Sequence, residues 1–187
     1  MSESPNKSDY RLVECLKKAD RGAAAELVDK YYNRLYLYMR RLGHNRAVSE
    51  ELVQETFLAA WQHIGQLTEA KALSSWIYRI AGNASSACWR RKKRRKEETA
   101  AEQLELLDDT GGNLGYAEPH QIEQFRLLEK AVAELSAKLK QAVVLHYMQG
   151  LTITEAARAA AVREGTFKSR LSRALKKLKK QMGHETG

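Results

Sequence analysis

Apolar residues recur every three to four positions along most of the chain, a spacing that places them on one face of a helix. One such stripe contains Val53, Phe57, Ala60, Trp61 and Ile64. A second stripe follows from about residue 70 and contains Leu73, Ile77, Ile80, Ala81, Ala84 and Cys88. Stripes with a period near 3.6 residues are typical of helices with one buried face. With only two prolines in 187 residues, the pattern predicts an all-α fold.

The C-terminal part of the chain has the most specific pattern. A helix is expected there with an apolar face of Phe167, Leu171, Ala174 and Leu178. Its other positions are basic or hydroxyl-bearing, and no acidic residue occurs between 165 and 184. A short helix rich in small residues is expected just upstream, started by a capping box of Thr152 and Glu155. Two short helices joined by residues 161–164 predict a helix-turn-helix, whose second helix can enter a major groove about 12 Å wide. The alternative is a solvated amphipathic helix in an α-bundle.

The charge of the chain is unevenly distributed. The formal net charge is +9, which favours a polyanionic partner, nucleic acid before membrane. Residues 90–96 are all basic, whereas residues 97–118 contain seven acidic residues and no basic one. The acidic stretch also holds three glycines and ends at Pro119. We therefore predict two small helical domains, 1–96 and 120–187, joined by a flexible acidic linker over 97–119.

Two polar faces in the first domain are candidates for function. The helix over residues 50–64 presents Glu51, Gln54, Glu55 and Leu58 opposite its apolar stripe, a face that composition alone would leave as solvated. The helix after residue 70 presents Arg79, Asn83, Ser86 and Arg90 at i, i+4, i+7 and i+11, with Trp76 beside them. Guanidinium groups can hold phosphates while an amide and an indole address bases. Trp76 is equally well explained as core, and Trp61 and Trp89 are better explained by packing than by base stacking.

Several classes of function find no support in the sequence. The five histidines show neither H-x-x-x-H nor H-E-x-x-H spacing, and phosphate-binding loops and nucleophile elbows are absent. We expect no enzyme, no metal and no cofactor. Cys15 and Cys88 fit small buried hydrophobic residues in a reducing cytoplasm. No stretch approaches eighteen apolar residues, so membrane insertion and export are not expected.

Three blocks of the chain resemble bacterial RNA polymerase sigma factors of the extracytoplasmic-function (ECF) group, in the sigma-70 family. Residues 50–61, EELVQETFLAAW, are similar to the family's polymerase-binding helix. Residues 75–83, SWIYRIAGN, are similar to its promoter-melting helix, where W-(L/I)-x-x-I-A-x-N is typical. Residues 150–157, GLTITEAA, and 165–174, GTFKSRLSRA, are similar to the helix-turn-helix that reads the upstream promoter element. The blocks occur in the family's order.

The resemblance implies partners and a role for each block. The polymerase-binding residues, facing the β′ coiled coil, would be Glu51, Gln54, Glu55 and Leu58. The residues for –10 recognition and melting would be Gln66, Leu67, Thr68, Lys71, Trp76, Arg79, Asn83 and Arg90. The residues for the –35 element would be Thr166, Lys168, Ser169, Arg170, Ser172, Arg173 and Lys177. The resemblance also implies a contact with the β flap, a linker inside the polymerase and an anti-sigma factor as regulator.

The chain departs from the family pattern at four positions. Ser136 stands where proline is usual, Ala161 replaces a turn glycine, Arg163 replaces a serine-like cap, and Ala87 stands where aspartate is frequent. These changes leave the fold expectation intact but make the promoter sequence unpredictable. A stand-alone helix-turn-helix regulator is the alternative function. Such a regulator would bind duplex promoter DNA by itself, whereas a sigma factor needs core polymerase.

Overall fold

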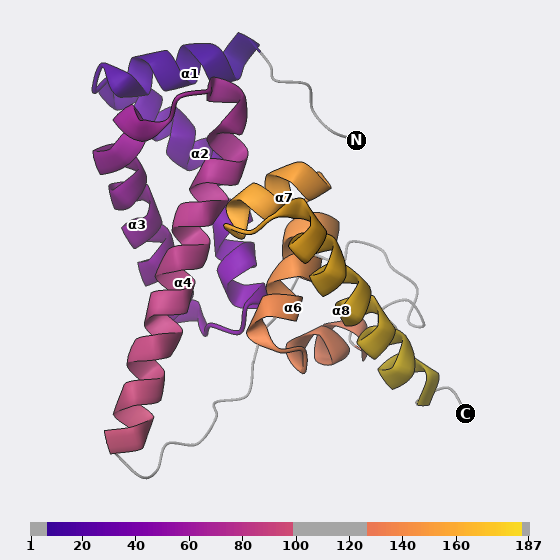
Figure 1. The fold of residues 1–187 in the computed structure, drawn as a ribbon. Helices are drawn as coiled ribbons and strands as arrows, with labels where there is room; N and C mark the ends of the chain where they lie inside the picture. Colours follow the sequence, from indigo (N-terminus) through magenta and orange to yellow (C-terminus); the bar gives the residue numbers. More distant parts are fainter. Residues whose placement is uncertain (1–6, 99–126, 185–187) are drawn as a thin grey trace, which may run out of the picture.

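The computed structural model describes residues 7–98 and 127–184, and within these ranges all regular structure is helical (Figure 1). The N-terminal domain contains α1 (Lys7–Lys17), α2 (Arg21–Arg41), α3 (Arg46–His63) and α4 (Leu73–Glu98). The C-terminal domain contains a helical segment at 127–133, then α6 (Ala137–Val143), α7 (Ile153–Ala159) and α8 (Glu164–His184). The predicted all-α fold with two helical domains is confirmed. Most of the predicted acidic linker lies outside the described residues.

In the N-terminal domain, α2, α3 and α4 pack side by side, and α1 crosses one end (Figure 1). The helix starts follow local capping: Asp20 accepts a hydrogen bond from the Ala23 amide, and Asn45 accepts one from the Val48 amide, each at 2.9 Å. The helix expected over residues 50–64 therefore starts earlier than predicted, because its cap is Asn45 and Ser49 is buried within the helix. Trp61, a member of the predicted apolar stripe, is only partly covered, with 36% of it exposed.

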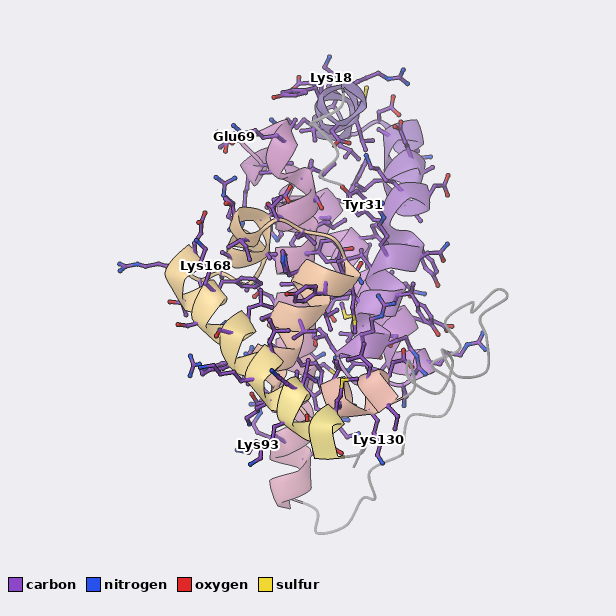
Figure 2. All side chains as sticks on the ribbon, turned by 90° about the vertical axis from the view of Figure 1, so that its right-hand side faces the viewer. Lys18, Tyr31, Glu69, Lys93, Lys130 and Lys168 are labelled. Carbon is purple, nitrogen blue, oxygen red and sulfur yellow. The ribbon has the colours of Figure 1, made fainter. Side chains whose placement is uncertain are left out.

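The connection between α3 and α4 is an ordered loop rather than an open one. It consists of two 3-10 turns, Ile64–Gln66 and Ala70–Ala72, and α1 packs against both. Leu67 and Ala70 are buried, whereas Gln66, Thr68 and Lys71 are exposed. The loop is thus anchored from below by apolar side chains and presents polar side chains to solvent. Figure 2 places Glu69 of this loop near the end of the molecule that carries Lys18, the residue after α1.

In the C-terminal domain the predicted helix-turn-helix is present in detail. The capping box forms, with the Thr152 amide donating to Glu155 Oε2 at 2.8 Å and the Glu155 amide donating to Thr152 Oγ1 at 3.3 Å. The turn passes through Ala161, whose φ of 52° lies in the left-handed region that glycine favours. The Val162 amide donates to the Ala157 carbonyl at 3.0 Å, as in a Schellman C-cap. The apolar face of α8 is buried as predicted: Phe167, Leu171, Ala174 and Leu178.

The two domains pack directly against each other. Helix α7 lies against α4 of the N-terminal domain, as well as against α8 of its own (Figure 1). The buried residues of α7 are Ala156, Ala157 and Ala159, and such small side chains allow a close approach on more than one side. The buried apolar residues of both domains form one contiguous cluster. The sequence did not predict this arrangement, because the acidic linker indicated separate domains.

Among the described residues, no helix is long and apolar enough to cross a membrane. Cys15 and Cys88 are unpaired and partly buried, packed against the core as expected for small hydrophobic side chains. Ser136 is the N-cap of α6 with a φ of −58°, an angle that the usual proline would also adopt, so its replacement leaves the local backbone unchanged.

His44 is a buried histidine at the α2–α3 turn. Its Nε2 lies 2.8 Å from Ser85 Oγ on α4, and its ring packs against Trp89. Burial, followed by the positive charges of Lys92 and Lys140, lowers the pKa of His44 to about 4. The folded protein therefore holds the neutral ring, whereas an unfolded chain would protonate it below about pH 6.5.

We expect His44 to make the stability of the protein depend on pH. Between about pH 6.5 and 4, His44 is protonated in the unfolded chain but stays neutral in the folded protein. The free energy of unfolding should therefore decrease by up to about 3 kcal/mol as the pH falls through this range. His44→Gln should flatten this part of the curve, whereas the exposed His63→Gln should leave it unchanged. Urea unfolding at half-unit pH intervals measures the difference. Equal slopes for wild type and His44→Gln would contradict the assignment.

Candidate nucleic-acid interface

The outer face of α8 is a basic surface on a rigid helix. Six predicted –35 residues are exposed, namely Thr166, Lys168, Ser169, Ser172, Arg173 and Lys177, and Arg170 is half-buried. The Arg173 Nε donates to the Ser169 carbonyl at 3.3 Å, which holds the guanidinium close to the helix. Lys168 lies near the N-terminal end of α8 (Figure 2). No acidic side chain interrupts the face, so α8 can present several cations and hydroxyls to one groove of a duplex.

A second polar surface runs along α4. Arg79, Asn83, Ser86 and Arg90 are all exposed and share one side of the helix. Exposed basic residues continue the surface toward the C-terminal end of α4, where Figure 2 shows Lys93. This stripe combines phosphate-binding guanidinium groups with an amide that both donates and accepts hydrogen bonds. It suits the backbone and bases of a separated strand.

Two predicted –10 residues do not reach this surface. Trp76 is only 6% exposed and belongs to the core, so its indole does not address bases in this conformation. Leu67 is buried as well and anchors the loop instead. Both residues support the surface from beneath. The prediction that these two side chains contact DNA directly did not allow for their burial. Large apolar side chains gain free energy when they are removed from water, and their spacing in the sequence does not show whether they are buried.

The loop and Asn83 are separated along the helix axis. Asn83 lies ten residues beyond Leu73, the first residue of α4, which corresponds to about 15 Å at 1.5 Å per residue. Arg79 lies between them, about 9 Å from Leu73. Asn83 and the loop therefore lie at clearly different heights along α4.

The third surface is the exposed face of α3. Glu51, Gln54 and Glu55 are exposed, and 64% of the Leu58 side chain faces solvent, an unusual exposure for a large apolar residue. Glu55 Oε2 lies 4.0 Å from the Arg91 guanidinium of α4, a pair of half-exposed side chains that solvent screens strongly. The exposed Leu58 and the partly exposed Trp61 are apolar features of the kind that protein-binding surfaces use, and the carboxylates around them would repel a nucleic acid.

Sequence reasoning missed the residues that join the domains. Tyr38 and Tyr78 are buried, and each hydroxyl is hydrogen-bonded to a glutamine of the other domain, Gln141 and Gln149 respectively. The helical periodicity places such tyrosines near the core, but no local pattern identifies a partner more than seventy residues away. Within the described ranges, no group of three histidine, cysteine or acidic side chains could hold a metal ion.

Comparison with known proteins identifies the family of both domains. The description "Sigma-70 region 2" matches residues 27–95, and "Sigma-70, region 4" matches residues 125–178. The ECF RNA polymerase sigma factor SigM of Bacillus subtilis is 30% identical over 158 residues, covering 82% of this chain and 91% of that protein. The ECF RNA polymerase sigma factor SigM of Mycobacterium tuberculosis is 28% identical, covering 95% of this chain and 86% of that protein.

Solved structures show the same fold. The structure of CnrH in complex with the cytosolic domain of CnrY aligns with a TM-score of 0.71 at 19% identity, covering 95% of this chain and 99% of that one. The sigma factor RpoE in complex with the anti-sigma factor NepR, from Bartonella quintana, aligns with a TM-score of 0.72 at 23% identity, covering 85% of this chain and 96% of that one.

Proposed function

This chain belongs to the ECF RNA polymerase sigma factors, and we propose that its three exposed surfaces divide the work of a transcription initiation factor among them. The face of α3 binds core RNA polymerase, the loop and the α4 stripe read and open the –10 element, and α8 reads the –35 element. The predicted domain boundaries, 1–96 and 120–187 around a linker at 97–119, are retained in this proposal. The protein acts in the cytoplasm by binding and catalyses no reaction itself.

The observation that carries the proposal is the separation of acidic and basic surfaces. The α3 face presents two carboxylates, an amide and a protruding leucine, whereas the α4 stripe and α8 present cations. Promoter DNA repels the first surface and attracts the other two. A factor that brings a polymerase to DNA needs one surface that binds the protein and two surfaces that bind the nucleic acid. In this proposal the β′ coiled coil of the polymerase contacts α3, and its β flap contacts the C-terminal domain.

The –10 surface works as a track for one separated strand. Arg79 and Arg90 hold phosphates, Asn83 bonds a base edge, and the polar residues Gln66, Thr68 and Lys71 of the loop receive a base further along the strand. Unstacking a base costs a few kcal/mol, and these contacts recover that free energy. An anti-sigma factor is proposed as a partner because RpoE and its anti-sigma factor NepR form the complex seen in a structure with the same fold.

A stand-alone regulator is the competing function, and it leaves the α3 face without a role. Binding to core polymerase distinguishes the two functions, because a sigma factor binds core polymerase whereas a regulator binds duplex promoter DNA alone.

Gln54→Ala with Glu55→Ala should weaken holoenzyme assembly by about tenfold, equivalent to about 1.4 kcal/mol. Melting temperature should stay nearly constant, because exposed substitutions usually change stability by less than about 0.5 kcal/mol.

The measurement is a pull-down with tagged core polymerase over a concentration series. Glu26→Ala with Asn33→Ala is the matched control, because it removes one carboxylate and one amide from exposed positions of α2. Wild-type assembly by the α3 variant would reject this face as the polymerase contact. Failure of the wild-type protein to bind core polymerase, together with tight binding of duplex promoter DNA, would favour the regulator.

A further inference from the structure

Helix α1 lies beside the loop between α3 and α4 and has no part in the three surfaces described above. The match to "Sigma-70 region 2" begins at residue 27, so α1 (Lys7–Lys17) lies ahead of it. In the structure, α1 nevertheless packs against both 3-10 turns of the loop and crosses the end of the bundle where the loop lies (Figure 1). Its buried face consists of Leu12, Val13 and Leu16. A helix outside the matched region therefore supports the loop proposed to contact the –10 element.

The loop itself, residues 64–72, is shaped by local backbone hydrogen bonds. The Leu67 amide donates to the Ile64 carbonyl at 3.0 Å, and the Ala72 amide donates to the Glu69 carbonyl at 2.9 Å. Neither 3-10 turn has a side-chain hydrogen bond at its N-cap. These local bonds fix the shape of each turn, but they do not fix the position of the loop relative to α4. That position depends on apolar packing, in which Leu67 shares one buried core with the apolar face of α1.

The C-terminal end of α1 is joined to α2 by a short, well-defined turn. Ala19 adopts a φ of 58°, and the Asp20 amide donates to the Cys15 carbonyl at 3.1 Å, as in a Schellman C-cap. The side chain of the same Asp20 accepts a hydrogen bond from the Ala23 amide at 2.9 Å and so caps α2. Because Asp20 both closes α1 and caps α2, this end of α1 has a fixed direction relative to α2.

The N-terminal end of α1 is attached to α2 by an ion pair. Lys30 Nζ on α2 donates to Asp9 Oδ1 in the first turn of α1. Only 29% of the Lys30 side chain and 21% of the Asp9 side chain are exposed, so solvent screens this pair less than a pair on the open surface. The turn at Ala19 and the ion pair lie at opposite ends of α1. Together they hold α1 against α2 in one orientation, with its apolar face on the loop.

We propose that α1 positions the loop for promoter opening, and that the Asp9–Lys30 ion pair is the contact that keeps α1 in place. Asp9 and Lys30 are positioning residues, because they act on DNA only through the loop. The effect on promoters rests on the proposed function of the loop, whereas the effect of α1 on the loop itself does not.

A loop held in one position presents its polar side chains, Gln66, Thr68 and Lys71, before a strand arrives. Ordering a loop on binding costs free energy, and a loop that is already ordered avoids this cost. Loosening α1 restores the cost, which then weakens the opened complex. The –35 contact on α8 and the polymerase contact on α3 do not involve the loop, so they should not change.

Hydrogen exchange in the free full-length protein tests whether α1 holds the loop. Lys30→Met removes the ammonium group and keeps an unbranched side chain. The Leu67 and Ala72 amides should then exchange about fivefold faster, the effect of losing one hydrogen bond of ordinary strength. Amides in the middle of α4 should keep their wild-type rates. Lys30→Arg should restore the loop rates, because a guanidinium group can still bind the Asp9 carboxylate.

Glu14→Gln is the matched control for these exchange rates. It removes a carboxylate from α1 whose partner, Lys17, belongs to the same helix, so the attachment to α2 remains. Wild-type exchange of the loop amides in Lys30→Met would overturn the proposal. An equal increase in the loop and throughout α4 would also overturn it, because it would show a general loss of stability instead of a local attachment.

Promoter opening tests the consequence for function. Holoenzyme with Lys30→Met should show about fivefold less permanganate reactivity at the –10 element, while core binding and the –35 footprint stay at wild-type levels. Lys30→Arg and Glu14→Gln should open the promoter normally. A protein that is merely less stable would lose core binding and –35 occupancy in parallel with opening, and that result would overturn the positioning role.

A variant of the loop separates this proposal from the proposed function. Thr68→Ala with Lys71→Ala should open the promoter poorly if the loop contacts the –10 element. If this variant opens poorly but Lys30→Met opens normally, the positioning role of α1 is overturned. If the loop variant itself opens normally, the proposed function of the loop fails, and faster exchange of the loop amides in Lys30→Met would still establish that α1 holds the loop.

Discussion

Holoenzyme that carries Asn83→Ala will occupy the –35 region normally and open the promoter about tenfold less. Asn83 is exposed on the α4 stripe, so its replacement by alanine should barely change the stability of the protein. Its amide can donate to and accept from a base edge. Losing such a contact removes about 1–2 kcal/mol of the free energy that offsets unstacking. The deficit appears only in the opened complex.

Permanganate reactivity of thymines around the start site measures this opening. Footprinting of the –35 region on the same complexes verifies that the first contact is intact. Asn33→Ala, an exposed asparagine on α2, is the matched control. A pre-melted bubble with the –10 sequence should restore part of the lost transcription, because the unstacking cost has then been removed. Wild-type reactivity in Asn83→Ala would mean that this amide plays no part in melting, and the role would pass to the loop.

The second large effect is a loss of sequence preference at the –35 element. A guanidinium that bonds a guanine bidentately contributes about 1–3 kcal/mol of discrimination, or roughly five- to 150-fold between bases. Arg170 and Arg173 lie in the N-terminal half of α8, on the face that the proposed function assigns to the groove. Arg170→Ala or Arg173→Ala should therefore relax preference at one position of the element.

Lys177 provides the internal comparison, since it is exposed one turn after Arg173 and further from the helix start. We expect Lys177→Ala to weaken binding evenly across sequences and to reduce the salt dependence by about one phosphate contact. Holoenzyme binding to a library of –35 variants at two salt concentrations separates these patterns. Identical behaviour of all three variants would show that α8 is a non-specific basic surface.

Much of the local structure could be predicted from the residues themselves. The capping box of Thr152 and Glu155 and the burial of Phe167 and Leu171 depend on contacts three or four residues apart. The exposed Arg79–Asn83 stripe follows from the same helical period. Such short-range relations are fixed by backbone geometry, so the pattern of residue types along the sequence is enough to predict them. The start of α3 lies earlier than the expected residue 50, because the side chain that caps the helix belongs to Asn45, ahead of the apolar stripe.

By itself, the sequence determined that the chain is helical, that it has two domains, and which faces are basic or acidic. Only the tertiary structure decided that Trp76 is covered and that Tyr38 and Tyr78 face glutamines of the other domain. Tyr78 and Gln149 are 71 positions apart. Their contact depends on how two helical surfaces fit together after each helix has formed. The alanine, glycine and hydroxyl-bearing positions along α4 and α7 contribute to that contact only when the helices are packed together.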